Sequence, residues 1–343
     1  MELKENLDDY FASLEMRGSE RYLLIEGPTD KEIFENFLNR RPSSDIGNSH
    51  DVKIDLVENI DLSDEPERPC GNREKVEYVA KKVLVDQQLR AKGIIFAGFA
   101  DREFDDFDLN QIQDLRMDHR VDGYLVWSRG HSVENYLFEE SLFYELLYDV
   151  LKISWKNQVV LRFRSVFIKT VMAACALGLA AHQLQRLTKI RDFINFNHLD
   201  LNENTVAIDF DALELSLSKK SSLDFDLAKL KDGYKSYYKQ LLDIDQTVIK
   251  WLCDGHLGLS LLLFACCKCV EEKYPGNDRG SGKSSVQQFI NSVLGLQPGK
   301  SKFYLCGNWW ARKAETKHCE YPKELLKLLG LPNRTDSSLN MYF

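Results

Sequence analysis

The sequence lacks a long hydrophobic stretch. None of its 343 residues falls in an uncharged apolar run that approaches the roughly 18 residues of a membrane-spanning helix. The N-terminus, MELKENLDDY, carries acidic residues where a secretory signal peptide has a basic start and an apolar centre. We therefore expect a cytoplasmic protein that does not associate with a membrane.

Several common kinds of site are also missing. The eight cysteines are irregularly spaced, so we expect reduced thiols and no disulfide framework. Residues 279–284 (RGSGKS) resemble a phosphate-binding loop, but Asn277 replaces the first glycine of that motif and no apolar strand precedes it. Cys253 and His256, with Cys266, Cys267 and Cys269, suggest a zinc site, but the last three lie in an apolar helical run, where core packing is favoured over zinc binding. No Ser-His-Asp order stands out.

Charge is divided unevenly along the chain. Residues 1–150 contain 18 Lys and Arg against 34 Asp and Glu, whereas residues 151–343 contain 27 against 19. An acidic half can gather metal-binding carboxylates, and a basic half can bind a polyanion. This fits a metal-dependent enzyme that acts on nucleic acid; two ordinary solvated faces are the alternative interpretation.

The hydrophobic pattern of residues 1–138 predicts an α/β domain. Runs at 22–25, 52–57, 93–100 and 123–127 are typical of strands. Thr29 is expected to cap a helix after the first run, with Glu32 as its capping-box partner. After the second run, a flexible surface loop is expected over the acidic segment 60–71 and a helix over 72–91, and a polar helix is expected after the third run. This order implies a mostly parallel sheet flanked by helices.

Residues 139–343 predict a second, mainly helical and basic region for substrate or partner binding. The stretch 173–181 is apolar enough for an interior helix, and 257–269 is also very apolar. Trp309 and Trp310 stand beside basic residues, so they could stack on unpaired bases or close a small core. A short helix is expected at 322–329.

Acidic residues follow two of the predicted strands. Glu26 and Asp30 follow the first, and Asp101, Glu103 and Asp105 follow the third. Ligands of open α/β sheets bind at the carboxyl ends of the strands, and carboxylates are the hard oxygen ligands that Mg²⁺ prefers. The pattern therefore predicts a site for one or two divalent ions; solvated surface acids are the alternative.

Two polar residues after the fourth strand are further candidates. Glu134 could be a metal ligand, orient a ligand through an outer-shell hydrogen bond, or complement a helix dipole. His131 could contact phosphate or act as an acid, although a structural histidine near a helix cap is the favoured interpretation.

The two acidic motifs together resemble a TOPRIM domain, the catalytic module of topoisomerases, primases and overcoming-lysogenization-defect (OLD) nucleases. Residues 25–30, IEGPTD, are similar to the first motif of the family in its E-G-x-x-D form. Asp101-Arg102-Glu103 resembles the later D-x-D motif. Glu103 replaces the second aspartate of that motif and lengthens the carboxylate by one methylene, and Asp105 is a candidate to share its role.

A closer resemblance covers most of the chain. The segments YLLIEGPTDKEIF, FADREFD and RGHSVENYLF, with the helical C-terminal half, are similar to the TOPRIM effector nucleases of the PARIS anti-phage system. The resemblance implies an endonuclease that uses Mg²⁺, or Mn²⁺ in its place, with Glu26, Asp101 and Glu103 as catalytic residues. The implied metal ligands add Asp30 and Asp105, and His131 and Glu134 are candidates for the outer shell.

The same resemblance implies a toxic effector that is held inactive by an ABC-class ATPase partner. It also implies host tRNA as the substrate and a homodimer as the active form. A non-catalytic adaptor with a TOPRIM fold and a DNA-cleaving OLD-like nuclease are the alternatives. The sequence does not assign the residues that contact nucleic acid.

Overall fold

The computed structural model describes residues 4–17, 20–39, 52–150, 156–202, 205–218, 226–273, 309–310 and 320–331. The chain forms two compact units. Unit 1 comprises Met1–Arg102, Arg116–Arg129 and Pro298–Phe343, and unit 2 comprises Glu103–Leu115 and Gly130–Gln297. The predicted division into 1–138 and 139–343 differs from these units, because residues 103–115 belong to unit 2 and the C-terminal segment belongs to unit 1.

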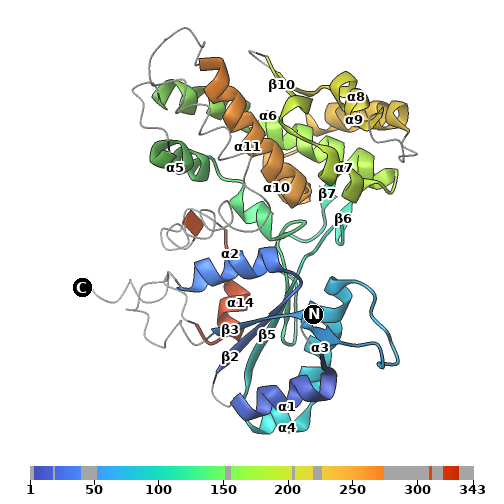
Figure 1. Ribbon diagram of the computed structural model, residues 1–343, viewed down its shortest axis with the longest axis vertical. Helices are drawn as coiled ribbons and strands as arrows, with labels where there is room; N and C mark the ends of the chain where they lie inside the picture. The colour runs from blue at the N-terminus through green and yellow to red at the C-terminus, as the bar shows by residue number, and fades with distance from the viewer. Residues whose placement is uncertain are drawn as a thin grey trace, which may run out of the picture. The chain divides into compact units, whose positions relative to one another are not determined.

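A five-stranded sheet forms the centre of unit 1 (Figure 1). Four strands are parallel and the short edge strand β8 is antiparallel to its neighbour, which confirms the predicted mostly parallel sheet. In spatial order the strands are β3 (Val52–Leu56), β2 (Arg21–Ile25), β5 (Ile95–Ala100), β9 (Leu125–Trp127) and β8 (Val121–Asp122).

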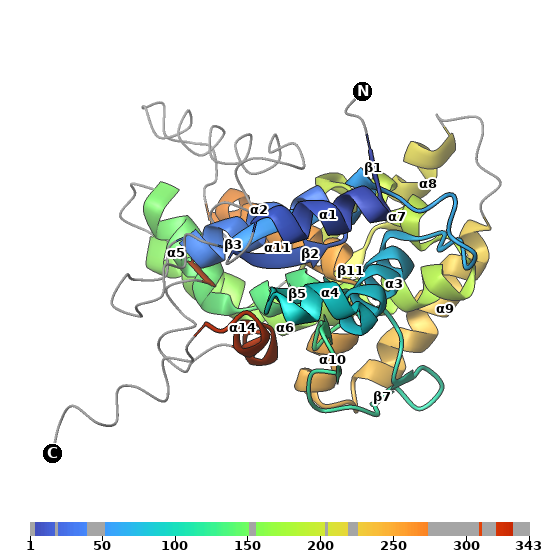
Figure 2. The same cartoon turned by 90° about the horizontal axis from the view of Figure 1, so that it is seen from below.

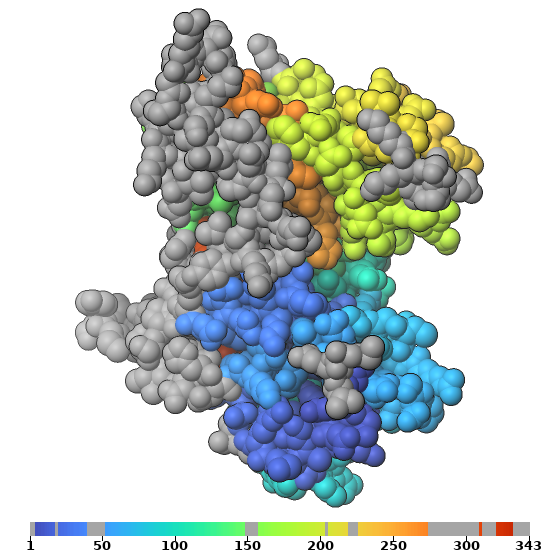
Figure 3. Space-filling view, in the orientation of Figure 1, coloured from blue at the N-terminus to red at the C-terminus, as the bar shows by residue number. Residues whose placement is uncertain are grey.

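Helices cover both faces of this sheet. Alternate residues of a strand point to opposite faces, so the fully apolar β5 requires cover on both. Helices α1 (Leu7–Arg17), α3 (Asn72–Val85) and α4 (Gln87–Ala91) share one core with Phe96 and Ala100 of β5. In the space-filling view, the dark blue residues of α1 lie beside the teal residues of α4 (Figure 3).

Close packing on this face explains a glycine in β5. A Cβ atom on Gly98 would lie 3.2 Å from Cβ of Ala80 and 3.3 Å from a methyl group of Val76, both on α3. The absence of a side chain at this position lets α3 approach the strand closely.

The opposite face is covered by α2 (Pro28–Asn39), by Trp309 and Trp310, and by the region of α14 (Lys323–Leu328). Phe34 of α2 meets Phe99 of β5 edge to face at 5.0 Å between ring centroids. Trp310 stacks on Phe37 at 4.4 Å, and its indole N–H donates to the carbonyl of Glu320 at 3.1 Å. Both tryptophans are buried, so they close a core and are not placed to stack on bases.

Two local predictions for unit 1 need correction. The predicted helix over 72–91 is interrupted at Asp86, whose side chain accepts from the Leu89 N–H at 2.8 Å and begins α4. The acidic segment after β3 was expected to be a loop, but it contains β4 (Ile60–Asp61), which pairs with β1 (Glu5–Asn6).

The prediction of a polar helix after the third strand is wrong. Residues 103–115 contain an antiparallel hairpin of β6 (Phe107–Asp108) and β7 (Gln113–Asp114). The side chain of Asp108 accepts from the backbone N–H groups of Asn110 and Gln111 at 2.9 and 3.1 Å. Such local bonds favour turns and compete with helix formation.

Unit 2 is mainly helical, as predicted for the C-terminal region. The long helix α6 (Lys156–Gln183) lies beside α9 (Leu227–Leu241) and α11 (Gly255–Lys273) (Figures 1 and 2). The other elements are α5 (Glu140–Val150), α7 (Leu187–Phe193), α8 (Phe210–Ser218), α10 (Gln246–Leu252), the 3-10 helices η3 (Val133–Leu137) and η4 (Phe196–His198), and a hairpin of β10 (Leu199–Leu201) and β11 (Val206–Ile208).

Two core predictions for unit 2 are confirmed. Residues 173–177 of α6 are buried, as expected of an interior helix. Cys266, Cys267 and Cys269 are buried and free, as expected of cysteines that pack in a core. The phosphate-loop-like segment 279–284 lies outside the described residues.

Among the described residues, one helix has the length and composition of a membrane span, Asn157–Gln183. Its most apolar window is 72% buried within the protein, and a buried core helix meets the same criteria. Taken together, α10 and α11 also pass this test, but the chain bends by 113° between the two helices.

We predict that Trp310→Ala lowers the free energy of unfolding of unit 1 by about 3–5 kcal/mol, because it removes a fully buried aromatic ring. Denaturant unfolding followed by circular dichroism measures the change. Met16→Ala is the control, because Met16 is 88% exposed and its truncation should change stability by about 0.5 kcal/mol or less. Equal effects of the two substitutions would mean that Trp310 is not part of this core.

Candidate functional site

The carboxyl ends of β2 and β5 bring two of the predicted acids together in unit 1. Leu24 of β2 pairs with Gly98 of β5 in a parallel register, so the two strands end at the same edge. Oε1 of Glu26 accepts a hydrogen bond from the backbone N–H of Asp101 at 2.6 Å. The ends of the first and third predicted strands therefore lie together, and the Glu26 carboxylate at one end is hydrogen-bonded to the backbone of the other.

Asp30 lies in the first turn of α2 and is 9% exposed. Its Oδ2 accepts from the Gly27 N–H at 3.2 Å, a bond that satisfies a backbone donor at the start of the helix. The helix begins at Pro28, a position that suits proline, so the prediction that Thr29 caps it is wrong.

Sequence reasoning missed two residues at the start of α3. The side-chain amide of Asn72 donates to the carbonyl of Glu26 at 3.0 Å, and Nη1 of Arg73 donates to the carbonyl of Arg102 at 3.2 Å. A signal was present in the sequence. A helix that follows a parallel strand begins at the carboxyl edge of the sheet, and this helix was expected to begin at residue 72.

Arg102, the middle residue of the Asp-Arg-Glu motif, has a structural role in unit 1. It is buried, its N–H donates to Oγ of Ser128 at 2.9 Å, and its Nη1 donates to the carbonyl of Arg129 at 2.9 Å. These bonds tie the end of β5 to the segment after β9. Arg102 thereby fixes the backbone next to Asp101.

Glu103 and Asp105 belong to unit 2 and are exposed. Glu103 has a positive φ of 52°, and Asp106 has one of 59°. Few residues other than glycine adopt this conformation, and it persists only where surrounding contacts hold it. One such contact is the hydrogen bond from the Glu103 N–H to the carbonyl of His131 at 2.8 Å.

The side chain of His131 is buried in unit 2. Its Nε2 lies 3.6 Å from Oδ2 of Asp254. Burial lowers the pKa of His131 to about 4, although the Asp254 carboxylate opposes this shift. The imidazole is therefore neutral at pH 7, which does not favour contact with phosphate through a charged ring, the less favoured of the roles considered for His131.

Glu134 is also buried and has two partners in unit 2. Its Oε2 accepts from Oγ of Ser132 at 2.7 Å, and its Oε1 lies 2.9 Å from Nδ1 of His256. A Cβ atom on Gly255 would lie only 2.0 Å from Oγ of Ser132, so the start of α11 packs directly on this group.

The Glu134–His256 contact is an ion pair. Burial raises the pKa of Glu134, but the charge of His256 outweighs burial and the pKa falls below its ordinary value. The carboxylate in turn raises the pKa of His256 to about 9. Because 43% of the His256 side chain is exposed, solvent screens the pair and we expect a small contribution to stability.

Asp254 is the second buried carboxylate of unit 2. It accepts hydrogen bonds from Nε and Nη2 of Arg191, and its Oδ1 accepts from the Leu257 N–H at 2.8 Å in the first turn of α11. Burial raises its pKa, but His131 and Arg191 outweigh this effect and the pKa lies below its ordinary value. Sequence reasoning did not find Asp254 or Arg191, because they are remote from each other in the chain, and it considered His256 only as a possible zinc ligand.

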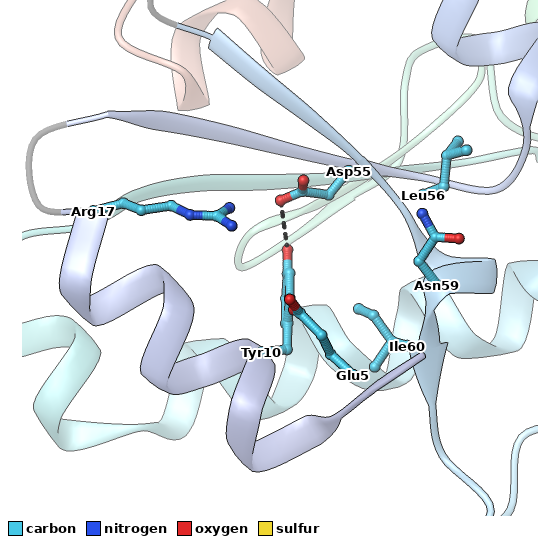
Figure 4. A pocket seen from close by; sticks show the side chains of 7 residues that line it. All are labelled: Glu5, Tyr10, Arg17, Asp55, Leu56, Asn59 and Ile60. Carbon is cyan, nitrogen blue, oxygen red and sulfur yellow. Dashed lines mark hydrogen bonds between the residues drawn. The ribbon is translucent and has the colours of Figure 1, made fainter. Parts of the chain in front are cut away.

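A cavity of about 340 Å³ lies elsewhere in unit 1 (Figure 4). The Tyr10 hydroxyl donates to Oδ2 of Asp55 at 3.3 Å inside it, and burial raises the pKa of Asp55. None of the predicted site residues lines this cavity, whose lining residues are Glu5, Tyr10, Arg17, Asp55, Leu56, Asn59 and Ile60.

The residues at the β2 and β5 ends fit Mg²⁺ in their chemistry. In the described part of the chain, no group of three or more His, Cys, Asp or Glu side chains is arranged to hold a metal ion. Mg²⁺ does not need such a cage, because it keeps several waters and is commonly held by one or two carboxylates and a substrate phosphate. Glu26 and Asp101 provide two carboxylates at adjacent strand ends.

No known family model matches the sequence, and a search of curated proteins finds no match.

We predict that the Glu134–His256 pair makes stability depend on pH. The pKa of His256 is raised in the folded state, so its contribution is complete below its ordinary pKa of about 6.5 and is lost as pH rises towards 9. The difference in unfolding free energy between the natural protein and His256→Gln should be largest near pH 6 and shrink by pH 9. Denaturant unfolding at both pH values measures it, and a difference independent of pH would contradict the pair.

Proposed function

We propose that the protein is a metal-dependent endonuclease of the TOPRIM type. The observation that carries the proposal is the meeting of Glu26 and Asp101 at the ends of two central parallel strands, with a 2.6 Å hydrogen bond between them. This edge is where open α/β sheets bind ligands. The Glu-Gly-x-x-Asp and Asp-x-Glu motifs that supply these residues support the family assignment.

Glu26 and Asp101 would hold Mg²⁺, or Mn²⁺ in its place, through their carboxylate oxygens. A divalent ion bound there would neutralise phosphate charge and favour attack by water on phosphorus. Arg102 fixes the backbone beside Asp101 through its bonds to Ser128 and Arg129. Glu103 and Asp105 follow in the chain, and the sequence motif is the reason to include them as further ligands.

We propose RNA, and host tRNA in particular, as the substrate, on the basis of the resemblance to PARIS effectors. The basic excess of the C-terminal half supports a polyanion. Much of that excess lies outside the described residues, since residues 274–308 and 311–319 contain seven Lys and Arg against two Asp and Glu.

We predict that Glu26→Gln abolishes nuclease activity and toxicity and leaves the fold intact. The amide has nearly the same shape as the carboxylate but lacks the charge that a hard cation needs. Cleavage should fall by more than the roughly 10–100-fold that loss of an outer-shell partner costs. RNA cleavage in the presence of Mg²⁺, followed by sequencing of the RNA ends, measures it, and circular dichroism checks the fold.

Glu35→Gln is the matched control, because Glu35 is an exposed acid on α2 whose recorded partner is Lys31. It should cleave at the natural rate. Cleavage by Glu26→Gln at the natural rate would contradict the site. No cleavage by the natural protein on RNA or DNA would favour the adaptor alternative, and cleavage of DNA alone would favour the OLD-like alternative.

We further propose that an ABC-class ATPase holds the chain inactive and that release produces an active homodimer. A nuclease directed at host RNA requires restraint, and the family resemblance supplies this partner. Co-expression with the product of the neighbouring gene, followed by size-exclusion chromatography, should show a complex with low nuclease activity. A chain that stays monomeric, forms no complex and is fully active alone would contradict this part of the proposal.

A further inference from the structure

Phe104 lies between the two acids Glu103 and Asp105 and holds their loop to the body of unit 2. Its ring meets the ring of His131 edge to face at 4.6 Å between centroids. On another side it meets His182 of α6 at 4.3 Å. The loop is thus anchored by an aromatic side chain, and its acids remain exposed.

The backbone of the loop is anchored at the same place. The Glu103 N–H donates to the carbonyl of His131 at 2.8 Å, next to the contact between the Phe104 and His131 rings. Glu103 and Asp106 both have positive φ angles, a conformation that only a few per cent of non-glycine residues adopt. His131 therefore meets the loop through both its backbone and its ring.

His131 is itself held on its other sides. Its N–H donates to the carbonyl of Trp251 at 2.7 Å, and its Nε2 lies beside Asp254. A Cβ atom on Gly130 would lie 2.7 Å from the Trp251 ring, so the backbone before His131 has no room to shift towards α10. On its Nε2 side, the ring contacts the Asp254 carboxylate.

Asp254 is fixed by two strong constraints. Arg191 of α7 donates hydrogen bonds to its carboxylate from two nitrogens. The carboxylate also accepts from the Leu257 N–H and thereby caps α11. A planar guanidinium bound to a carboxylate through two nitrogens gives directional control as well as attraction. A continuous set of contacts therefore runs from Arg191 through Asp254 and His131 to Phe104.

We propose that Asp254 is a positioning residue within unit 2: through His131 and Phe104 it fixes the loop that carries Glu103 and Asp105, the two acids that the sequence motif adds as metal ligands. This inference rests on the proposed function for the role of the two acids. The restraint on the loop itself is independent of that function. Outer-shell partners of metal ligands act in the same way, by fixing the ligands that they contact.

Asp254→Asn tests the inference in the full chain, because asparagine retains a helix-capping oxygen and loses the charge that binds Arg191. We expect faster hydrogen exchange at residues 103–105, measured by mass spectrometry. We also expect the affinity for Mn²⁺, measured by calorimetry without RNA, to fall about 10–100-fold. In RNA cleavage at saturating metal, kcat should fall and KM for RNA should stay unchanged.

Glu272→Gln is the matched control. It breaks another ion pair of unit 2, from Arg162 to Glu272 at 2.7 Å, that has no recorded contact with the loop. It should leave the exchange at 103–105 and the Mn²⁺ affinity unchanged. Equal effects of the two substitutions would overturn the inference, because the loop would then respond to general loss of stability.

Phe104→Leu is the second variant and keeps the test decisive if Asp254→Asn does not fold. It should reproduce the faster exchange and weaker Mn²⁺ binding, because leucine lacks the ring that meets His131 and His182. Unchanged exchange in the folded variants would overturn the positioning role. Faster exchange with no Mn²⁺ binding in the natural protein would instead support the restraint and contradict the proposed metal site.

Discussion

The parallel pairing of β2 with β5 is the constraint on which the candidate site of unit 1 depends. Both strands are apolar on both faces, and helices cover each face. A shift in their register would therefore move their apolar side chains out of the cores on both faces. That register sets where the two strands end. The 2.6 Å bond from Asp101 to Glu26 follows from it, as do the bonds from Asn72 and Arg73 at the start of α3.

Unit 2 shows a different way of fixing polar residues. Glu134 and Asp254 are carboxylates removed from water, which is costly unless each is paired and hydrogen-bonded. Each has a cationic partner and a further donor: His256 and Ser132 for Glu134, and Arg191 and the α11 backbone for Asp254. Buried groups satisfied in this way restrict the backbone that carries them.

The sequence was sufficient to predict features that depend on local pattern. Apolar runs bounded by turns located β2, β3, β5 and β9, and the acids that follow β2 and β5 were expected at one sheet edge. The hairpin at 107–114 was missed, because short polar strands have no apolar period to reveal them. The Asp254 contacts were missed for another reason: Arg191 is 63 residues away in the chain, and its pairing depends on how α7 and α11 pack.

The Asp-Arg-Glu motif takes its rigidity from two separate cores. In unit 1, Asp101 is fixed by the pairing of β5 and by the bonds of Arg102 to the segment after β9. In unit 2, Glu103 is fixed by the carbonyl of His131 and by the ring contacts of Phe104. A substitution in one core can therefore displace one acid of the motif and leave its neighbour in place. Such a local displacement does not require unfolding of the whole protein.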